Sequence, residues 1–106
     1  MPKYLIQGSY SGEGLKGLLK EGGSKRREAA EQAVKGLGGR LEAYYYAFGE
    51  HDFVVIADLP SNVDASALSL TANLSGTLKS HMTVLITPEE VDQATKRTVK
   101  FRPPGK

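Results

Sequence analysis

The chain contains no cysteine. It therefore forms no disulfide, offers no thiolate nucleophile and builds no cysteine metal site. It also has no apolar stretch close to the about 20 residues that a membrane-spanning helix needs. Residues 1–6 show no long apolar region behind a basic one, as a secretory leader would. We therefore expect a soluble cytoplasmic protein that does not associate with a membrane.

A strong charge of either sign is also missing. Fourteen basic and twelve acidic residues give a formal net charge of +2, and they are mixed except in residues 25–27 and 96–106. This balance is too mild to indicate a nucleic-acid partner. The length of 106 residues, with 40% hydrophobic and 25% charged residues, is typical of one globular domain. We predict one domain over residues 1–98 and a basic, proline-containing tail over 99–106.

The first half of the chain predicts a strand followed by two helices. Residues 3–10 are strand formers that end in a Ser/Gly cluster, and residues 13–20 form a short helix. The Gly22-Gly23 pair interrupts that helix, after which Ser24 caps a second one that ends at Gly38-Gly39. The second helix has a stripe with the spacing of a buried face, made of Ala30, Ala33, Val34 and Leu37.

A hairpin follows, with strands over residues 40–48 and 51–59 and a two-residue turn at Gly49-Glu50. This turn pairs Tyr46 with Phe53 and Phe48 with His51 across the strands. The alternation of side chains then assigns two faces. One face carries Tyr44, Tyr46, Phe48, His51, Phe53, Val55 and Leu59, and the other carries Leu41, Ala43, Tyr45, Ala47, Val54 and Ile56.

The second half predicts a helix, a strand and a short terminal helix. Ser61 with Asp64 resembles a capping box that opens a helix through about residue 74. Residues 78–87 alternate as a fourth strand, and residues 87–90 (Thr-Pro-Glu-Glu) open a helix to about residue 97. The expected buried stripe of the longer helix is Val63, Ala67, Leu70 and Leu74.

This order of elements, β-α-β-β-α-β, predicts an α+β ferredoxin-like fold with an antiparallel sheet, plus a short C-terminal helix. Both faces of the hairpin are apolar, whereas two helices can cover only one face of a sheet. Several exposed aromatic side chains would leave a large apolar patch on a monomer. We therefore expect a homodimer or higher homo-oligomer that pairs sheet to sheet. The alternative is that the terminal helix or the tail folds over the open face.

Residues 45–56, Tyr-Tyr-Ala-Phe-Gly-Glu-His-Asp-Phe-Val-Val-Ile, resemble the GYD family of small bacterial and archaeal proteins. The resemblance covers roughly residues 4–90, including the stretches at 14–17, 25–28, 58–60 and 85–90. The family's Gly-Tyr-Asp turn is present as residues 49–52, with His51 in place of tyrosine. The resemblance implies a ferredoxin-like domain of the dimeric α/β-barrel type, from a family without an established biochemical activity.

Residues 12–17 match the dinucleotide pattern G-x-G-x-x-G, follow a strand and open a helix. The next strand begins only at Arg40, so that its acidic residue, Glu42, lies beyond the expected spacing of about 20 residues, and a hairpin follows where a doubly wound sheet needs a parallel strand. We therefore interpret the glycines as a tight turn into a helix. The backbone amides there, together with Lys16, are a candidate site for a carboxylate or phosphate group.

The two histidines, His51 and His81, are the candidate catalytic residues, because imidazole titrates near neutral pH. They could act as acid and base, or join Glu42 or Asp58 around a metal. Since two histidines in a chain of this size need no special explanation, we predict no metal site and no cofactor. Asp52 is a candidate ligand-binding residue, although a carboxylate at a hairpin end commonly accepts turn amides.

Two functions remain open at this stage. The first is a homo-oligomeric binding module with a pocket against the sheet, between subunits, for a small anionic or aromatic molecule. Tyr44, Tyr46, His51 and Asp52 would line or flank it, with Lys16 near its rim. The second is a cofactor-independent oxygenase or isomerase that uses His51 or His81 as a base. Single-stranded RNA binding is disfavoured, since residues 51–59 lack the basic and paired-aromatic pattern of RNA-recognition strands.

Overall fold

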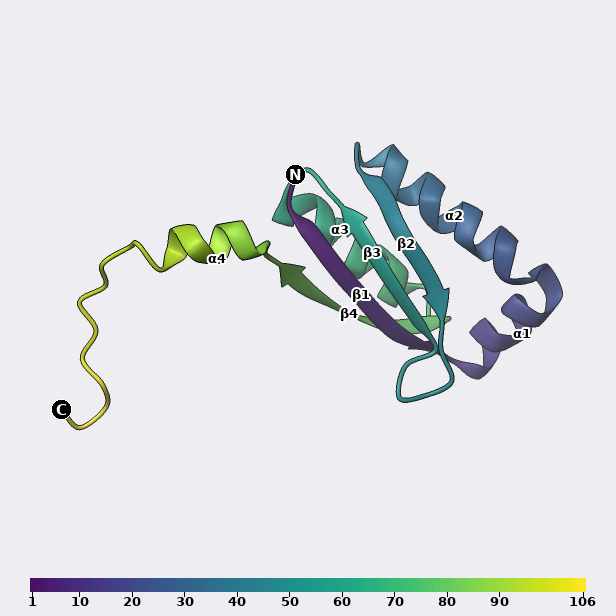
Figure 1. The fold of residues 1–106 in the computed structure, drawn as a ribbon. Helices are drawn as coiled ribbons and strands as arrows, with labels where there is room; N and C mark the ends of the chain where they lie inside the picture. Colours follow the sequence, from purple (N-terminus) through teal and green to yellow (C-terminus); the bar gives the residue numbers. More distant parts are fainter.

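The computed structural model describes all residues from 1 to 106 and contains one four-stranded sheet (Figure 1). The strand order is β2-β3-β1-β4, and every neighbouring pair is antiparallel. This topology confirms the α+β ferredoxin-like fold. The elements are β1 (Lys3–Tyr10), α1 (Gly12–Glu21), α2 (Gly23–Gly36), β2 (Arg40–Tyr46), β3 (Phe53–Asp58), α3 (Asn62–Leu74), β4 (Leu78–Leu85) and α4 (Pro88–Ala94).

The helix starts follow from their capping residues. The Ser61 hydroxyl accepts the Asp64 N–H at the start of α3, and Thr87 and Glu90 form a reciprocal capping box at α4. Both caps were predicted. The second helix differs, because α2 already begins at Gly23, with Gly22 as the N-cap at φ +88°. The predicted Ser24 cap is therefore wrong, and glycine supplies the positive φ that joins α1 to α2.

The hairpin is wider than a two-residue turn. Tyr46 pairs with Phe53 as predicted, but β2 ends and β3 begins at these residues, so residues 47–52 form a loop. The Ala47 N–H donates to the Asp52 carbonyl at 2.9 Å, and the Asp52 N–H donates to the Gly8 carbonyl of β1 at 2.7 Å. The predicted strand pair of Phe48 with His51 is therefore wrong, and strand alternation does not assign a face to either residue.

The aromatic face of the hairpin lies under the helices. Tyr44 and Tyr46 are opposite Val55 and Phe53. Phe53 and Val55 belong to a buried core that contains Tyr4, Ile6, Val34, Phe53, Val55, Ala57, Leu59 and Ala65. A register shift between Leu41 and Ala43 also places Leu41 on this face. The assignment of Leu41 to the opposite face is therefore wrong.

The side of helix α3 that faces the sheet is not the predicted one. Ala65 is buried in the core and Leu68 packs against it. Val63, Leu70 and Leu74 are instead 79%, 72% and 87% exposed. The helix has two apolar stripes, and the stripe with smaller side chains is the one that faces the sheet. The predicted buried stripe of α3 is therefore wrong.

No helix covers the opposite face of the sheet, which we call the open face (Figure 1). Register places on it an apolar group made of Leu5, Ala43, Tyr45, Val54, Ile56 and Leu85. Tyr45 is 69% exposed.

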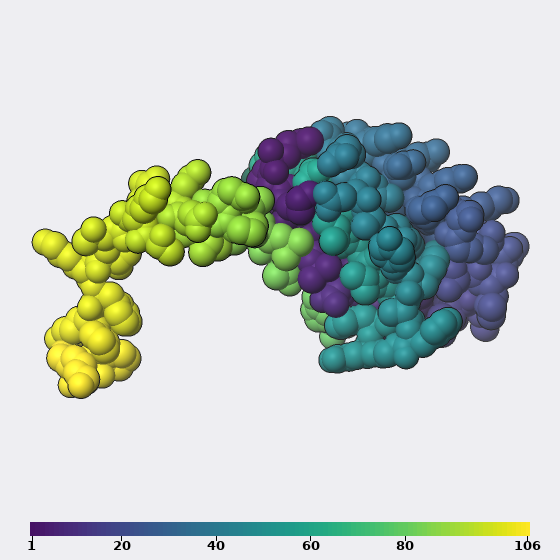
Figure 2. Space-filling view, in the orientation of Figure 1, coloured from purple at the N-terminus to yellow at the C-terminus, as the bar shows by residue number.

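The C-terminal segment extends away from the body as a separate arm (Figures 1 and 2). Helix α4 and the residues after it are exposed, and the radius of gyration is 16.9 Å, against about 13 Å for a compact domain of this length. The segment does not fold back over the open face, so the intramolecular alternative for covering that face is not realised. No helix of the chain is both long and apolar enough to cross a membrane.

Candidate functional site

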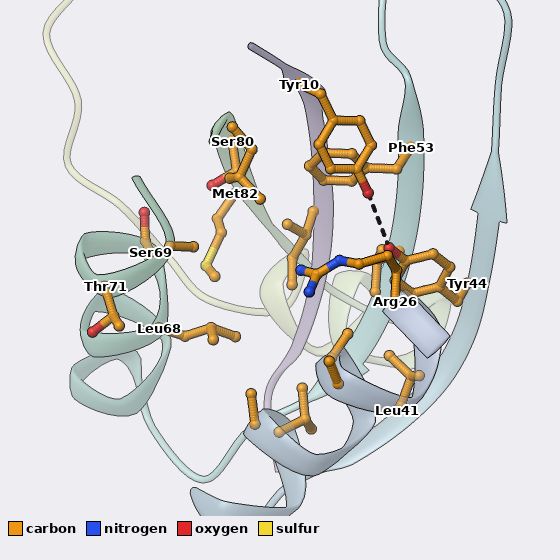
Figure 3. Close-up of a pocket in the computed structure, with 18 residues that line it drawn as sticks. Tyr10, Arg26, Leu41, Tyr44, Phe53, Leu68, Ser69, Thr71, Ser80 and Met82 are labelled. Carbon is orange, nitrogen blue, oxygen red and sulfur yellow. Dashed lines mark hydrogen bonds between the residues drawn. The ribbon is translucent and has the colours of Figure 1, made fainter. Parts of the chain in front are cut away.

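The main candidate site is an apolar cavity of about 240 Å³ between the sheet and helices α2 and α3 (Figure 3). Helix α2 packs mainly on β2 and α3 mainly on β4, which are the two edge strands, and the cavity lies between the two helices over the central strands. Alanines line the helix side of the gap, where longer side chains would close it. They are Ala29, Ala30 and Ala33 on α2 and Ala72 on α3.

The sheet side of the cavity is aromatic and aliphatic. The Tyr10 ring packs on Phe53 with their centroids 5.3 Å apart, and Met82 enters from β4. The hydroxyls of Tyr10 and Tyr44 lie 3.5 Å apart and form a hydrogen bond at one end of the cavity (Figure 3). The two phenols, together with Ser80 of β4, are therefore the polar groups that a ligand would meet from the sheet.

Burial raises the pKa of both phenols above the ordinary 10.0, and for Tyr44 the hydrogen bond with Tyr10 adds to the shift. Both groups therefore stay neutral across the physiological range. They can donate or accept a hydrogen bond, but they supply no negative charge to the cavity.

The raised pKa of Tyr44 predicts a loss of stability at alkaline pH. Below about pH 10 the phenol is protonated in both states, whereas above it the unfolded chain releases a proton that the folded chain retains. The free energy of unfolding should therefore fall as the pH rises from 8 to 11. Tyr44→Phe should reduce that fall by up to about 1 kcal/mol. Urea denaturation at both pH values measures it.

The charged group at the cavity is Arg26, from the first turn of α2 (Figure 3). Its side chain points toward the middle of the cavity beside Tyr44 and is 35% exposed. Its carboxylate neighbour is Glu21, at 3.7 Å. Ion pairs between exposed side chains contribute about 0–1 kcal/mol, so Arg26 is only weakly engaged.

Of the predicted ligand-binding residues, only Tyr44 lines this cavity. Tyr46 lies next to it, with the two ring centroids 5.3 Å apart and nearly perpendicular, and its hydroxyl donates to the Gly23 carbonyl at 3.0 Å. Tyr46 therefore links β2 to the start of α2 by a hydrogen bond and packs against Tyr44 without lining the cavity itself.

Asp52 and Lys16 lie elsewhere. The Asp52 carboxylate accepts the Tyr10 N–H at 2.8 Å, which ties the hairpin loop to the end of β1. Lys16 is exposed on α1 and does not reach the cavity. Gly14, in the same glycine pattern, is buried, and a side chain there would collide with the Thr77 carbonyl. Gly14 thus permits a close approach of α1 to the segment before β4, whereas Gly12 and Gly17 have open space around them.

The histidines come together on the other side of the sheet. The rings of His51 and His81 are 6.3 Å apart, beside Lys79 and Ser9, in a shallow polar hollow of about 200 Å³. The prediction that His51 shares a face with Tyr44 and Tyr46 is wrong, because the loop over residues 47–52 breaks the alternation.

Neither Glu42 nor Asp58 joins the histidines. Lys3 binds both carboxylates, at 2.7 and 3.0 Å, and Arg40 binds Asp58 at 3.1 Å. The Lys3 hydrogen bond lowers the pKa of the Asp58 carboxyl, so this group remains ionised. Asp58 is the last residue of β3 and pairs with Lys3 at the start of β1.

Tyr10 and Met82 are cavity residues that the sequence did not single out, and Arg26 stood out there only as part of the basic run over residues 25–27. A signal was present for Arg26, which lies four residues before Ala30 and so continues the apolar stripe of α2 by one turn. A cation on the sheet-facing side of a helix is unusual, and small alanines beside it indicate unfilled space.

The fold and the cavity together define a single ferredoxin-like domain with an apolar chamber between its sheet and its helices. The family model described as GYD domain matches residues 4–95 of the 106-residue chain. The chain therefore belongs to the GYD domain family. A search of curated proteins finds no match to it.

Proposed function

We propose that this GYD domain protein is a small-molecule-binding module whose ligand occupies the cavity between the sheet and α2 and α3. The observation that carries the proposal is an apolar chamber of about 240 Å³ in a chain of only 106 residues. An engineered apolar cavity of about 150 Å³ is enough to bind benzene. The chamber therefore suits a molecule with one or two rings, held mainly by burial of its apolar surface.

Binding is favoured over catalysis by the residues that face this ligand. They are aliphatic, aromatic and small hydroxyl side chains with one arginine, and both phenols are held neutral. A histidine base would have to act beside the aromatic rings, but His51 and His81 lie across the sheet from them. The oxygenase or isomerase alternative thus lacks a base at the chamber where its substrate would lie.

The second part of the proposal is that two copies pair through the open face. A two-fold interface must be complementary to itself, because the same patch is presented by both partners. The open face meets this condition, with apolar side chains at its centre and both signs of charge at one end, Lys3 and Arg40 beside Glu42 and Asp58. A second copy is therefore the occupant that its chemistry fits.

The dimensions of the open face are adequate for such a dimer. Its strands contain six to eight residues. At about 3.3 Å per residue and about 4.8 Å between strands, the face measures roughly 23 by 19 Å. Pairing of two such faces would bury at least about 900 Å² of surface. This area is close to the total of roughly 1,000 Å² that a specific interface buries. Each copy would keep its own chamber on the outside of the pair.

A thermal-shift titration tests the binding proposal. Naphthalene-2-carboxylate and naphthalene-2-carboxamide are the probes, with glucose as a polar control of similar mass. At ten times the dissociation constant, a ligand adds about 1.4 kcal/mol of stability, which raises Tm by roughly 5–10 °C in a domain of this size. We expect that shift with a naphthalene probe and none with glucose. A cooperative melt that neither naphthalene compound moves would contradict the proposal.

A further inference from the structure

We infer that the ligand of this chamber carries an anionic group, a carboxylate or a group of similar charge, which pairs with Arg26 while the ring system lies against Phe53 and Met82. This inference rests on the proposed function and names the chemical class of the ligand. Three observations about Arg26 support it.

The first observation is the isolation of the charge. Eighteen residues line the chamber, fourteen of them hydrophobic, and Arg26 is the one charged residue among them. No carboxylate faces it across the chamber. A ligand that enters the chamber without a negative charge would displace water from the guanidinium and leave it with only the weak Glu21 contact, which carries a desolvation cost. An anionic ligand would replace that water with a charge-assisted hydrogen bond.

The second observation is the weakness of the competing contact. The Glu21 carboxylate is 3.7 Å from the Arg26 guanidinium, and its side chain is 46% exposed. This distance is longer than the about 2.7–2.9 Å of a strong N–H to carboxylate hydrogen bond. A ligand carboxylate can therefore accept two hydrogen bonds from the Arg26 guanidinium without breaking a strong interaction.

The third observation is the local charge of α2. Its first turn contains Lys25 and Arg26 and no acidic residue, which is the reverse of the usual distribution, since helix starts favour negative groups. The Tyr10 and Tyr44 hydroxyls lie on the same side of the chamber (Figure 3), and since one of their two protons is used in their mutual hydrogen bond, the other can be donated to an anion beside Arg26. Arg26 is thus the only charge in the chamber, while Ser69, Thr71 and Ser80, on the side away from Tyr44, contribute neutral hydroxyls, and this difference sets the orientation of an anionic ligand (Figure 3).

Isothermal titration of naphthalene-2-carboxylate and its neutral carboxamide tests this inference, because the two probes have the same ring system and nearly the same shape. We expect the wild-type protein to bind the carboxylate about tenfold more tightly. Arg26→Gln should remove that preference and leave carboxamide affinity within about twofold. Arg26→Lys should retain part of the preference, since a point charge remains without the bidentate fork.

Two matched variants separate a direct contact from a general charge effect. Arg27→Gln removes the same charge from the next position of α2, which is exposed and outside the chamber, and should preserve the preference. Glu21→Gln releases Arg26 from its partner and should tighten carboxylate binding about twofold.

The outcomes are distinct. Equal binding of both probes, or a preference that survives Arg26→Gln in a variant with wild-type circular dichroism, overturns the anionic class while the chamber remains a binding site. A loss of preference in Arg27→Gln as large as in Arg26→Gln also overturns it. Binding of neither probe to the wild-type protein overturns the proposed function itself.

Discussion

Ile56→Lys should convert the proposed homodimer of about 22.8 kDa, twice the 11.4 kDa of one chain, into a monomer. Ile56 is on the central strand β3, opposite Leu5 and Ala43, in the middle of the open face. A lysine there would be buried without a partner in a sheet-to-sheet pair, at a cost of about 2–5 kcal/mol at each of the two copies. Light scattering after size exclusion at micromolar concentration measures the change.

Val63→Lys is the matched control, because Val63 is 79% exposed on the outer side of α3. The same substitution there should leave the dimer intact. A wild-type protein that is already monomeric at 50 μM would contradict the pairing, and so would a dimer that survives Ile56→Lys. Dissociation by Val63→Lys alone would move the interface to α3 and refute the open-face pairing.

Ala72→Phe should abolish binding of the naphthalene probes. Ala72 lines the chamber from α3, and a phenylalanine side chain at this position would fill most of the space between α3 and Met82. We expect affinity to fall at least tenfold, about 1.4 kcal/mol. The fold should persist because the side chain enters space that is otherwise unfilled. Isothermal titration measures affinity, and far-ultraviolet circular dichroism with a urea melt reports on folding.

Ala67→Phe provides the same change on the exposed side of the same helix and should bind as the wild type does. If Ala72→Phe unfolds, Ala30→Leu fills the chamber from α2 with a smaller side chain and should still weaken binding. Unchanged affinity in a folded variant with a filled chamber would show that the probes bind elsewhere.

The order of the elements and several of their ends were predictable because they depend on local signals. The Ser61 and Thr87 caps, the strand pairing of Tyr46 with Phe53, and the four-strand α+β order all follow from short-range spacing. The family resemblance also extends over most of the chain, in agreement with the matched residues 4–95.

The faces of the elements were harder to predict because they depend on tertiary packing. Gly49 is compatible with the predicted two-residue turn, but the hairpin loop is six residues long. This difference alone moves His51 away from the aromatic side chains. In α3, two stripes of apolar residues have helical spacing, and the larger side chains are the exposed ones. Spacing cannot choose between two such stripes.

The chamber was predicted against the sheet but between two subunits, whereas the structure has it within one chain. Strand alternation correctly put Tyr44 with Phe53, but it does not say on which side the helices lie. The helices determine that side, and the small side chains of α2 determine that the space beneath them stays open. Arg26 becomes a candidate only once that space is known, since elsewhere a single arginine on a helix is an ordinary solvated group.

Nuclear magnetic resonance of methyl-labelled protein titrated with naphthalene-2-carboxylate tests the central claim most directly, because the two sides of the sheet carry different methyl groups. We expect the largest chemical-shift changes at Val34, Val55 and Met82, which line the chamber between sheet and helices. Changes concentrated at Leu5, Val54 and Ile56 would place the ligand on the open face and contradict it.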